Sequence, residues 1–208
     1  MRPERLVAVL GTDTGVGKTW ATAQVLARLR EAGATVAVRK PVQSFAPCDG
    51  ETDADVLARA TGETSEEVCP PHRSYGIAMA PPIAAAFLGV EPPMIDDLVT
   101  SLDWPAARVQ LGVVETVGGP RSPIAGDGDS AALAAAIEPD LAVLVAPAGL
   151  GAINAVRLCA PAMPQPFVVF LNHFDGGDLH DRNRRWLQVD GFDTVVDVAE
   201  LTRHIAGA

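Results

Sequence analysis

The chain has 208 residues, of which 48% are hydrophobic and 20% charged, a length and balance that fit one folded domain with a sizeable core. Its formal net charge of −10 argues against nucleic acid as a main partner, because phosphate backbones bind to basic surfaces. No stretch approaches the roughly 20 apolar residues of a membrane-spanning helix, and the apolar part of the first segment is too short for a secretory signal. We therefore expect a cytoplasmic protein that binds no membrane.

The apolar pattern alternates between short strand-like runs and helix-like segments. In chain order it predicts a strand over residues 6–10, a helix over 18–31, a strand over 35–39, a helix over 52–60, a loose segment over 63–75, a helix over 82–88 that Pro81 opens, a strand over 109–115, and a helix over 130–137 with Ser130 as its N-cap. The chain then continues with a strand over 141–146, a helix over 152–160, a strand over 167–171, a helix over 179–187, a weak strand over 194–196 and a helix over 198–205.

Continuous apolar strands that alternate with helices are typical of a sheet with both faces covered. The sequence therefore predicts a single α/β domain over residues 1–208, with a doubly wound, mostly parallel sheet and helices on both faces. In such folds ligands bind beyond the carboxyl ends of the strands. The polar motifs described next all lie at or just after such ends.

The strongest motif is Gly11–Thr19 (GTDTGVGKT), between the first predicted strand and the first predicted helix. Consecutive backbone N–H groups of such a loop surround phosphate oxygens, helped by the helix N-terminus. Lys18 would reach the outer phosphates of a nucleoside triphosphate and Thr19 would hold Mg²⁺, which predicts a fold of the P-loop NTPase type. The spacing departs from the usual rule, because Thr12 stands where glycine is expected. The alternative is a purely structural turn.

Lysine is rare in this chain. The 16 basic residues are 14 arginines and two lysines, Lys18 and Lys40. Lys40 follows the second predicted strand and precedes Pro41, which ends strand pairing. A lysine at this edge can neutralise a transferring phosphoryl group, for which a compact, flexible ammonium is suited. The alternatives are chance and a solvated lysine at a strand end.

Two acidic residues complete the predicted metal site. Asp53 begins the helix after the second strand, and Glu115 ends the third strand. Mg²⁺ prefers hard oxygen ligands, which Thr19, Asp53 and Glu115 would supply together. For Asp53 the alternative is a carboxylate placed at a helix start because the helix dipole favours it there.

Two weaker motifs follow later strands. Gly149–Asn154 offers a second helix N-terminus suited to an anion. Asn172 stands after the fifth strand, where its amide would hydrogen-bond a nucleobase edge. Asparagine is also a common turn residue, so that alternative stays open.

The ordered motifs resemble those of dethiobiotin synthetases. The matching segments are GTDTGVGKT (11–19), RKPVQS (39–44), TDADVLA (52–58), VETVGGP (114–120), GLGAIN (149–154) and LNH (171–173). They differ from partition-type ATPases of the same superfamily, which carry a signature lysine where this chain has Asp13.

The resemblance implies an ATP-dependent ring closure. Members of the family convert 7,8-diaminononanoate, CO₂ and MgATP to dethiobiotin, ADP and phosphate through a carbamate and a carbamic-phosphoric anhydride. The substrate brings its own nucleophile, so the protein has to position the reactants and stabilise charge on the moving phosphoryl group. The partners implied are small molecules and, because the family's carboxylate-binding segment lies across a two-fold interface, a second copy of the chain in a homodimer.

Matching motif positions imply the following site residues. Catalytic contacts with phosphates and carbamate are implied for Thr14, Lys18 and Lys40. Nucleotide contacts are implied for Gly15, Val16, Gly17, Lys18, Thr19, Trp20, Asp53, Glu115, Gly118 and Asn172. Substrate contacts are implied for Thr12, Ser44, Gly118, Gly151, Ile153 and Asn154, and Mg²⁺ ligands are Thr19, Asp53 and Glu115.

The chain also departs from the family pattern. Phe45 replaces a glycine, and Thr116-Val117 stands where the family has Gly-Ala, so both changes are expected to add bulk near the substrate. No clear adenine loop is seen near residues 190–198, which leaves base preference open. The alternatives are another ATP-dependent amide- or ring-forming ligase, a nucleotide-switched ATPase that acts as a binding protein, and a paralogue that binds ATP without forming product. Asp13 weighs against the switch and the retained lysines against the inactive paralogue.

Overall fold

The computed structural model describes residues 1–48 and 50–207. Its main sheet contains β1 (Arg5–Gly11), β2 (Val36–Arg39), β5 (Leu111–Glu115), β6 (Leu141–Pro147), β7 (Phe167–Asn172) and β8 (Thr194–Val195), and a small second sheet contains β3 (Gln43–Ser44) and β4 (Ser74–Tyr75). The helices are α1 (Lys18–Glu31), α2 (Asp53–Thr61), α3 (Ser65–Val68), α4 (Pro81–Phe87), α5 (Ile95–Thr100), α6 (Ser130–Ala136), α7 (Ala152–Cys159), α8 (Asp178–Val189) and α9 (Val198–Ala206), with 3₁₀ turns η1 (Pro71–Arg73) and η2 (Ala160–Ala162).

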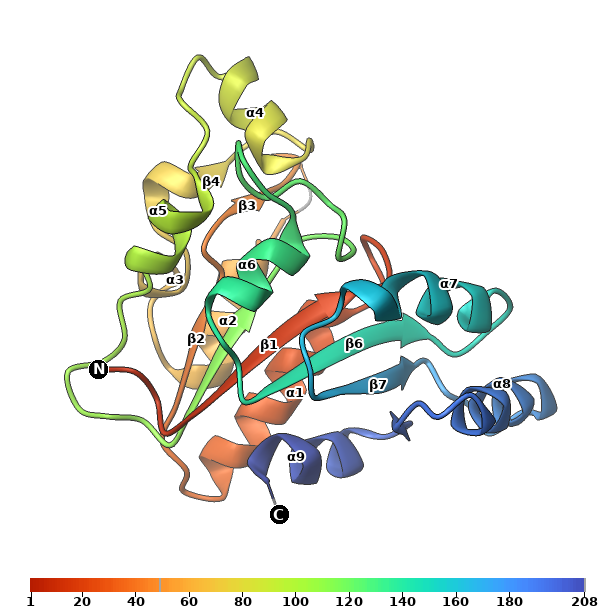
Figure 1. The fold of residues 1–208 in the computed structure, drawn as a ribbon. Helices are drawn as coiled ribbons and strands as arrows, with labels where there is room; N and C mark the ends of the chain where they lie inside the picture. The colour runs from red at the N-terminus through yellow and green to blue at the C-terminus, as the bar shows by residue number, and fades with distance from the viewer. Residues whose placement is uncertain (49, 208) are drawn as a thin grey trace.

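The main sheet has the order β2-β5-β1-β6-β7-β8, and each of its described strand pairs is parallel. β1 therefore lies inside the sheet with β5 on one side and β6 on the other. Val9 of β1 pairs with Glu115 of β5, and Arg39 of β2 pairs with Val114. This register brings the carboxyl ends of β2, β5 and β1 to one edge, as the doubly wound prediction requires (Figure 1).

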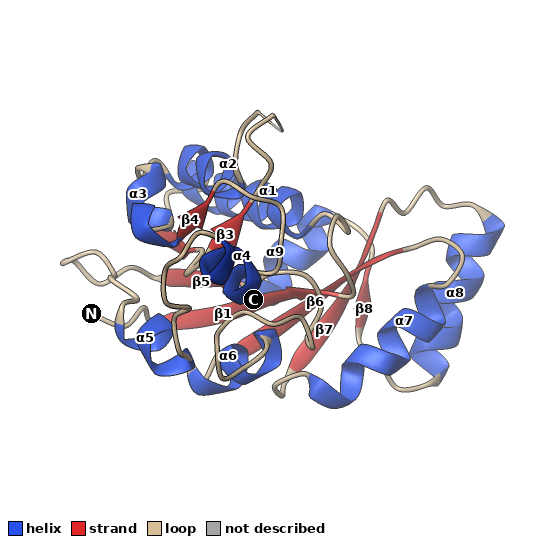
Figure 2. Cartoon of the chain, turned by 90° about the horizontal axis from the view of Figure 1, so that it is seen from above, coloured by secondary structure: helices blue, strands red, loops and turns tan. Residues whose placement is uncertain are grey.

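Alternate residues of the strands feed two hydrophobic cores. Val7 and Val9 of β1 pack on the face covered by α1, α2 and α9, whereas Leu6, Ala8 and Leu10 pack on the face covered by α5, α6, α7 and α8. Figure 2 shows the strands between these layers, with α1 and α2 on one side and α5 and α6 on the other. Because both faces are covered, the strands are apolar throughout, which is the pattern that the sequence analysis used.

Three local predictions were wrong. Ser130 is not the N-cap of α6, because the Asp129 carboxylate accepts the N–H of Ala132 while the Ser130 hydroxyl donates to the Val117 carbonyl. Residues 63–75 are more regular than predicted, with α3, η1 and β4 inside them. The sequence analysis also missed α5, a short helix that follows a proline-rich turn and buries Leu98.

None of the helices in the described part of the chain is both long enough and apolar enough to cross a bilayer.

Candidate active site

The loop between β1 and α1 has the backbone of a phosphate cradle. Gly15 and Gly17 adopt φ values of +74° and +93°, which only glycine adopts at low cost. A Cβ on Gly17 would also lie 2.1 Å from the Asn172 amide nitrogen, and one on Gly11 would lie 2.7 Å from a Val16 methyl. The glycines therefore let the loop close tightly in front of the N-terminus of α1, where backbone N–H groups favour an anion.

Lys18 is buried at the start of α1, and its ammonium donates to the Asp13 carbonyl over 3.1 Å. Burial, together with the nearby Lys40 ammonium, lowers the pKa of Lys18 to about 8, although Glu115 and Asp53 act in the opposite direction. An anion arriving at the loop would favour the charged form again. The described geometry thus holds a cation inside the cradle.

Lys40 joins the two predicted acids. Its Nζ lies 2.6 Å from Asp53 Oδ2 and 2.8 Å from Glu115 Oε1. The Thr19 hydroxyl lies 2.9 Å from Asp53 Oδ1 and 2.8 Å from Glu115 Oε1, and it donates its one proton to either acid. Asp53 and Glu115 lie 34 and 96 positions after Thr19 in the chain. Together with Thr19 and Lys40 they form one polar cluster next to the loop.

The charges of this cluster stabilise one another. Burial alone would lower the pKa of Lys40, but the Glu115 and Asp53 carboxylates outweigh it and hold that pKa above its ordinary value. Burial likewise opposes ionisation of Asp53, yet the Lys40 ammonium and hydrogen bonds from Lys40 and Thr19 lower the pKa of Asp53. Lys40 is therefore held protonated and Asp53 ionised.

Secondary structure places each member of the cluster. Glu115 ends β5 and Lys40 directly follows β2, two strands that are hydrogen-bonded neighbours. Asp53 is the first residue of α2, which Thr52 begins with a capping box. The buried Gln43 accepts the N–H of Ala54 over 3.0 Å, so it fixes the turn that carries Asp53. Gln43 was not predicted, because a glutamine inside a motif does not reveal which backbone N–H its side chain accepts.

A cavity of about 730 Å³ opens above the cluster. It brings together most of the predicted site residues: Thr14, Gly15, Gly17, Lys18, Thr19, Lys40, Ser44, Asp53 and Gly118. Its remaining wall is largely apolar and includes Phe45, Met79, Ala80, Pro81, Val117 and Pro123. Gln43, Glu51, Thr52 and Ser122 also line it. The cavity therefore combines charged groups suited to phosphates with apolar surface suited to a hydrocarbon chain.

Phe45 and Val117 add bulk to this wall, as expected, but Thr116 does not. Thr116 is fully buried, and its hydroxyl donates to the Val9 carbonyl over 3.2 Å. Its side chain therefore packs into the sheet and is not part of the cavity wall.

Other predicted residues lie outside the cavity wall. Val16 is buried under the loop, Thr12 is partly exposed beside it, and Trp20 is 49% exposed on α1. Asn172 is buried, and its amide donates to the Val16 carbonyl over 2.9 Å while its oxygen accepts the N–H of His173. Asn172 thus stabilises the phosphate loop through its hydrogen bond to the Val16 carbonyl.

The segment at the start of α7 lies away from the cavity of its own chain. Gly151 and Asn154 are exposed, and Ile153 is partly buried against the core of that face. None of the three lines the cavity. Within one copy of the described chain, this segment and the lysine cluster are separate surfaces.

The oxygen chemistry of the cluster fits Mg²⁺. The described residues contain no group of three or more His, Cys, Asp or Glu suited to a metal, so the candidate ligands are two carboxylates and one hydroxyl. Glu115 Oε2 is buried and has no hydrogen-bond partner among the described residues, and such an oxygen is costly unless a cation or donor meets it. Hard oxygens are the ligands that Mg²⁺ prefers.

Residues 5–165 match the family model described as an AAA domain. The chain is 36% identical over 181 residues to the ATP-dependent dethiobiotin synthetase BioD of Haloferax mediterranei, covering 84% of this chain and 75% of that protein. Proteins of the same name from Anaeromyxobacter sp. and Mycobacterium avium are each 39% identical, covering 74% and 76% of this chain and 69% and 68% of theirs. The chain belongs to the ATP-dependent dethiobiotin synthetase family.

Membership of the dethiobiotin synthetase family confirms the resemblance seen in the motifs and makes the chain an ATP-dependent ligase. Solved structures with less similar sequences show the same fold. A plasmid partition protein from Borrelia burgdorferi superposes with a TM-score of 0.61 at 16% identity, covering 100% of this chain and 97% of that one. The cell division protein FtsY from Thermotoga maritima superposes with a TM-score of 0.58 at 15% identity, covering 94% of this chain and 63% of that one. The P-loop NTPase fold is thereby confirmed.

Proposed function

We propose that residues 1–208 form one synthetase domain that converts 7,8-diaminononanoate and CO₂ to dethiobiotin with MgATP. The observation that supports this most is the convergence of both lysines of the chain, Lys18 and Lys40, on one cavity whose wall also contains the phosphate loop and apolar side chains. The relatives with this activity in their names align over most of the chain.

The reaction needs no nucleophile from the protein. One substrate amine adds to CO₂ and loses a proton, which gives a carbamate. A carbamate oxygen attacks the γ-phosphorus and the bond to the β-phosphate oxygen breaks, which releases ADP. The second amine then attacks the carbonyl carbon of the mixed anhydride and loses a proton, the C–O bond to phosphate breaks, and phosphate leaves as the ring closes. Each step is helped by holding the groups close and by offsetting negative charge.

The chain's own residues suit these tasks. Backbone N–H groups at Gly15 and Gly17 and the Lys18 ammonium would bind the phosphates. Lys40 lines the same cavity as Lys18 and the phosphate loop, so its ammonium would offset charge on the carbamate and the transferring phosphoryl group. Ser44 and the apolar wall would orient the diamine chain.

Thr19, Asp53 and Glu115 would hold Mg²⁺. When bound, the ion would neutralise phosphate charge and orient the outer phosphates. The partnerless Glu115 oxygen supports this assignment because it is a hard, buried ligand without another use in the described structure.

We also propose a homodimer that acts in the cytoplasm. Leu150 is 94% exposed and Leu158 is 73% exposed, and both lie at or on α7, beside the exposed Gly151 and Asn154 that would bind the partner's substrate carboxylate. Exposed leucines of this kind favour an interface. The free cysteines fit a reducing compartment. Sedimentation analysis tests the dimer: Leu158→Glu should give a monomer, whereas Leu88→Glu, a change of an exposed leucine far from α7, should not.

The decisive experiment mixes the protein with MgATP, bicarbonate and the diamine and detects dethiobiotin by mass spectrometry. Product that depends on all three substrates supports the proposal. Absence of product, with phosphate release that the diamine does not change, would refute it. Lys40→Arg should lower turnover by roughly tenfold or more, because a planar guanidinium replaces a preorganised ammonium contact.

A further inference from the structure

Among the described residues, the edge of the sheet nearest the site has no neighbouring strand. β2 is the outermost strand on its side of the main sheet, so one edge of its backbone lacks a ladder partner. Three backbone groups near Lys40 point away from the sheet at this edge: the N–H and the C=O of Val38, and the N–H of Lys40 itself. A short strand with an open edge is prone to shift or fray.

Residues 63–68 and the side chain of Arg39 satisfy these three positions. Glu63 Oε2 accepts the N–H of Val38 over 3.0 Å, and the Val68 carbonyl accepts the N–H of Lys40 over 2.8 Å. The Arg39 guanidinium donates to the Val38 carbonyl. Residues 63–68, which run from the loop after α2 to the end of α3, thus take the place of a neighbouring strand at this end of β2.

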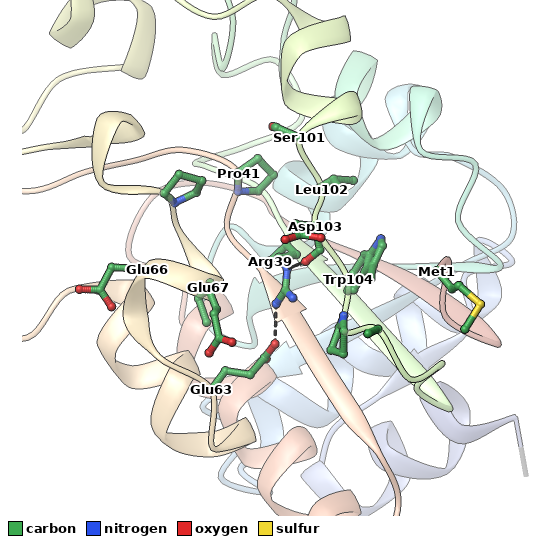
Figure 3. Close-up of a pocket in the computed structure, with 14 residues that line it drawn as sticks. Met1, Arg39, Pro41, Glu63, Glu66, Glu67, Ser101, Leu102, Asp103 and Trp104 are labelled. Carbon is green, nitrogen blue, oxygen red and sulfur yellow. Dashed lines mark hydrogen bonds and ion pairs between the residues drawn. The ribbon is translucent and has the colours of Figure 1, made fainter.

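Arg39 and Glu63 join these contacts into one assembly. Arg39 Nη1 lies 2.6 Å from Glu63 Oε1, and the two side chains are only 7% and 12% exposed. Arg39 Nε donates to the Asp103 carbonyl, and the guanidinium stacks 5.1 Å from the centre of the Trp104 ring. Figure 3 shows Arg39 extending from the strand end to Glu63, with Trp104 beside it in a surface groove.

We propose that Glu63 is a positioning residue for Lys40. Its carboxylate holds the backbone of Val38 and the side chain of Arg39 at once, and these are the two residues that precede Lys40 on the strand. Lys40 contacts its two carboxylates at 2.6 and 2.8 Å, so a small backbone shift would move the ammonium out of its place. The role in catalysis rests on the proposed function, whereas the effect on the Lys40 ammonium does not.

The test uses the fact that the chain has only two lysines. Labelling lysine with ¹³C at the ε-carbon gives two NMR signals, which Lys18→Arg assigns. Glu63→Ala should shift or broaden the Lys40 signal strongly and change the Lys18 signal less, because Lys18 senses the change only through the charge of the nearby Lys40 ammonium. Glu63→Gln keeps an acceptor for the Val38 N–H but loses the charge that Arg39 needs, so it should have a smaller effect on the Lys40 signal. It replaces Glu63→Ala in this measurement if that variant does not fold.

Kinetics supply the second measurement. Glu63→Ala should lower kcat for dethiobiotin formation by about tenfold or more, as misplaced catalytic groups do, and should leave KM for ATP within about twofold, because the phosphate loop is untouched. The matched control is Glu66→Ala: Glu66 lies three residues away in the same groove, is exposed, and its side chain has no hydrogen bond or ion pair within residues 1–48 and 50–207. It should change neither measurement.

The outcomes separate the two proposals. An unchanged Lys40 signal in Glu63→Ala overturns the positioning role, whatever the rate. A shifted signal with wild-type kcat also overturns it. If the wild-type protein forms no dethiobiotin while the Lys40 signal still shifts in Glu63→Ala, the proposed function fails and the control of the lysine by Glu63 stands.

Discussion

Lys40→Met should make the protein bind Mg²⁺ more tightly even as it abolishes turnover. The Lys40 ammonium contacts the two carboxylates that would bind the metal, Asp53 at 2.6 Å and Glu115 at 2.8 Å. Both cations would share the negative charge of the same two carboxylates, although Glu115 Oε2 has no partner among the described residues. In the wild-type protein a metal ion that binds without nucleotide therefore meets the repulsion of the ammonium beside its ligands.

The contact distances also set the expected loss of folding stability in Lys40→Met. At about 2.7 Å each contact gives a gross attraction of about 6 kcal/mol for an effective dielectric constant of about 20. The cost of burying the ammonium offsets much of it, and the half-exposed Asp53 is screened by solvent. Removing one partner of a buried pair costs about 3–5 kcal/mol, so we expect the metal-free variant to lose about 3 kcal/mol of its free energy of unfolding, the low end of that range.

The assay measures Mn²⁺ binding by electron paramagnetic resonance, with Mg²⁺ as competitor and without nucleotide. The Kd should fall at least about tenfold in Lys40→Met, which corresponds to 1.4 kcal/mol, and Mg²⁺ should raise the Tm of the variant more than that of the wild type. Arg59→Met is the control, because it removes an exposed cation from the same helix as Asp53 and should leave the metal affinity unchanged. A Kd that stays the same or rises in Lys40→Met would refute the shared use of the two carboxylates.

Three further changes probe the loop, the cavity wall and the buried thiol. Gly17→Ala should abolish ATP binding in calorimetry, since the new Cβ would meet the Asn172 amide at 2.1 Å and the backbone has a positive φ. If Phe45 only narrows the cavity, Phe45→Gly should leave the KM for the diamine unchanged or lower it, as steady-state kinetics would show. Burial raises the pKa of Cys69 to about 12, so a maleimide at pH 8 should label the exposed Cys48 and leave Cys69 until the protein unfolds.

Each of these has a control or an opposite outcome. Gly33→Ala, where a Cβ meets no atom within 4 Å but φ is also positive, separates backbone strain from the collision in the loop. A large loss of activity in Phe45→Gly would mean that the ring binds the substrate. Because the folded pKa of Cys69 is raised, its contribution to stability is present below the unfolded pKa of about 8.5 and is lost as the pH rises toward 12. Rapid labelling of Cys69 in the folded protein would contradict its buried placement.

Most elements could be predicted because their residues carry the pattern locally. The limits of α1 match the predicted 18–31, and the five long strands fall within a residue or two of the predicted runs. The helix α5 was missed, since six residues after a proline-rich turn offer too short a period to recognise. Ser130 was misplaced as a cap because its neighbour Asp129 is an equally good capping residue.

The phosphate loop was determined by the sequence itself. Gly11, Gly15 and Gly17 lie close in the chain to Lys18, and the positive φ of Gly15 and Gly17 and the contact of Gly11 with Val16 are local properties of the loop. Only the tertiary structure decided what Lys40 does. Its contacts with Glu115, 75 positions away, depend on the strand order β2-β5-β1, and its position depends on Glu63, which lies in a segment that looked irregular. Contacts between distant residues arise from strand register and packing, which no local pattern encodes.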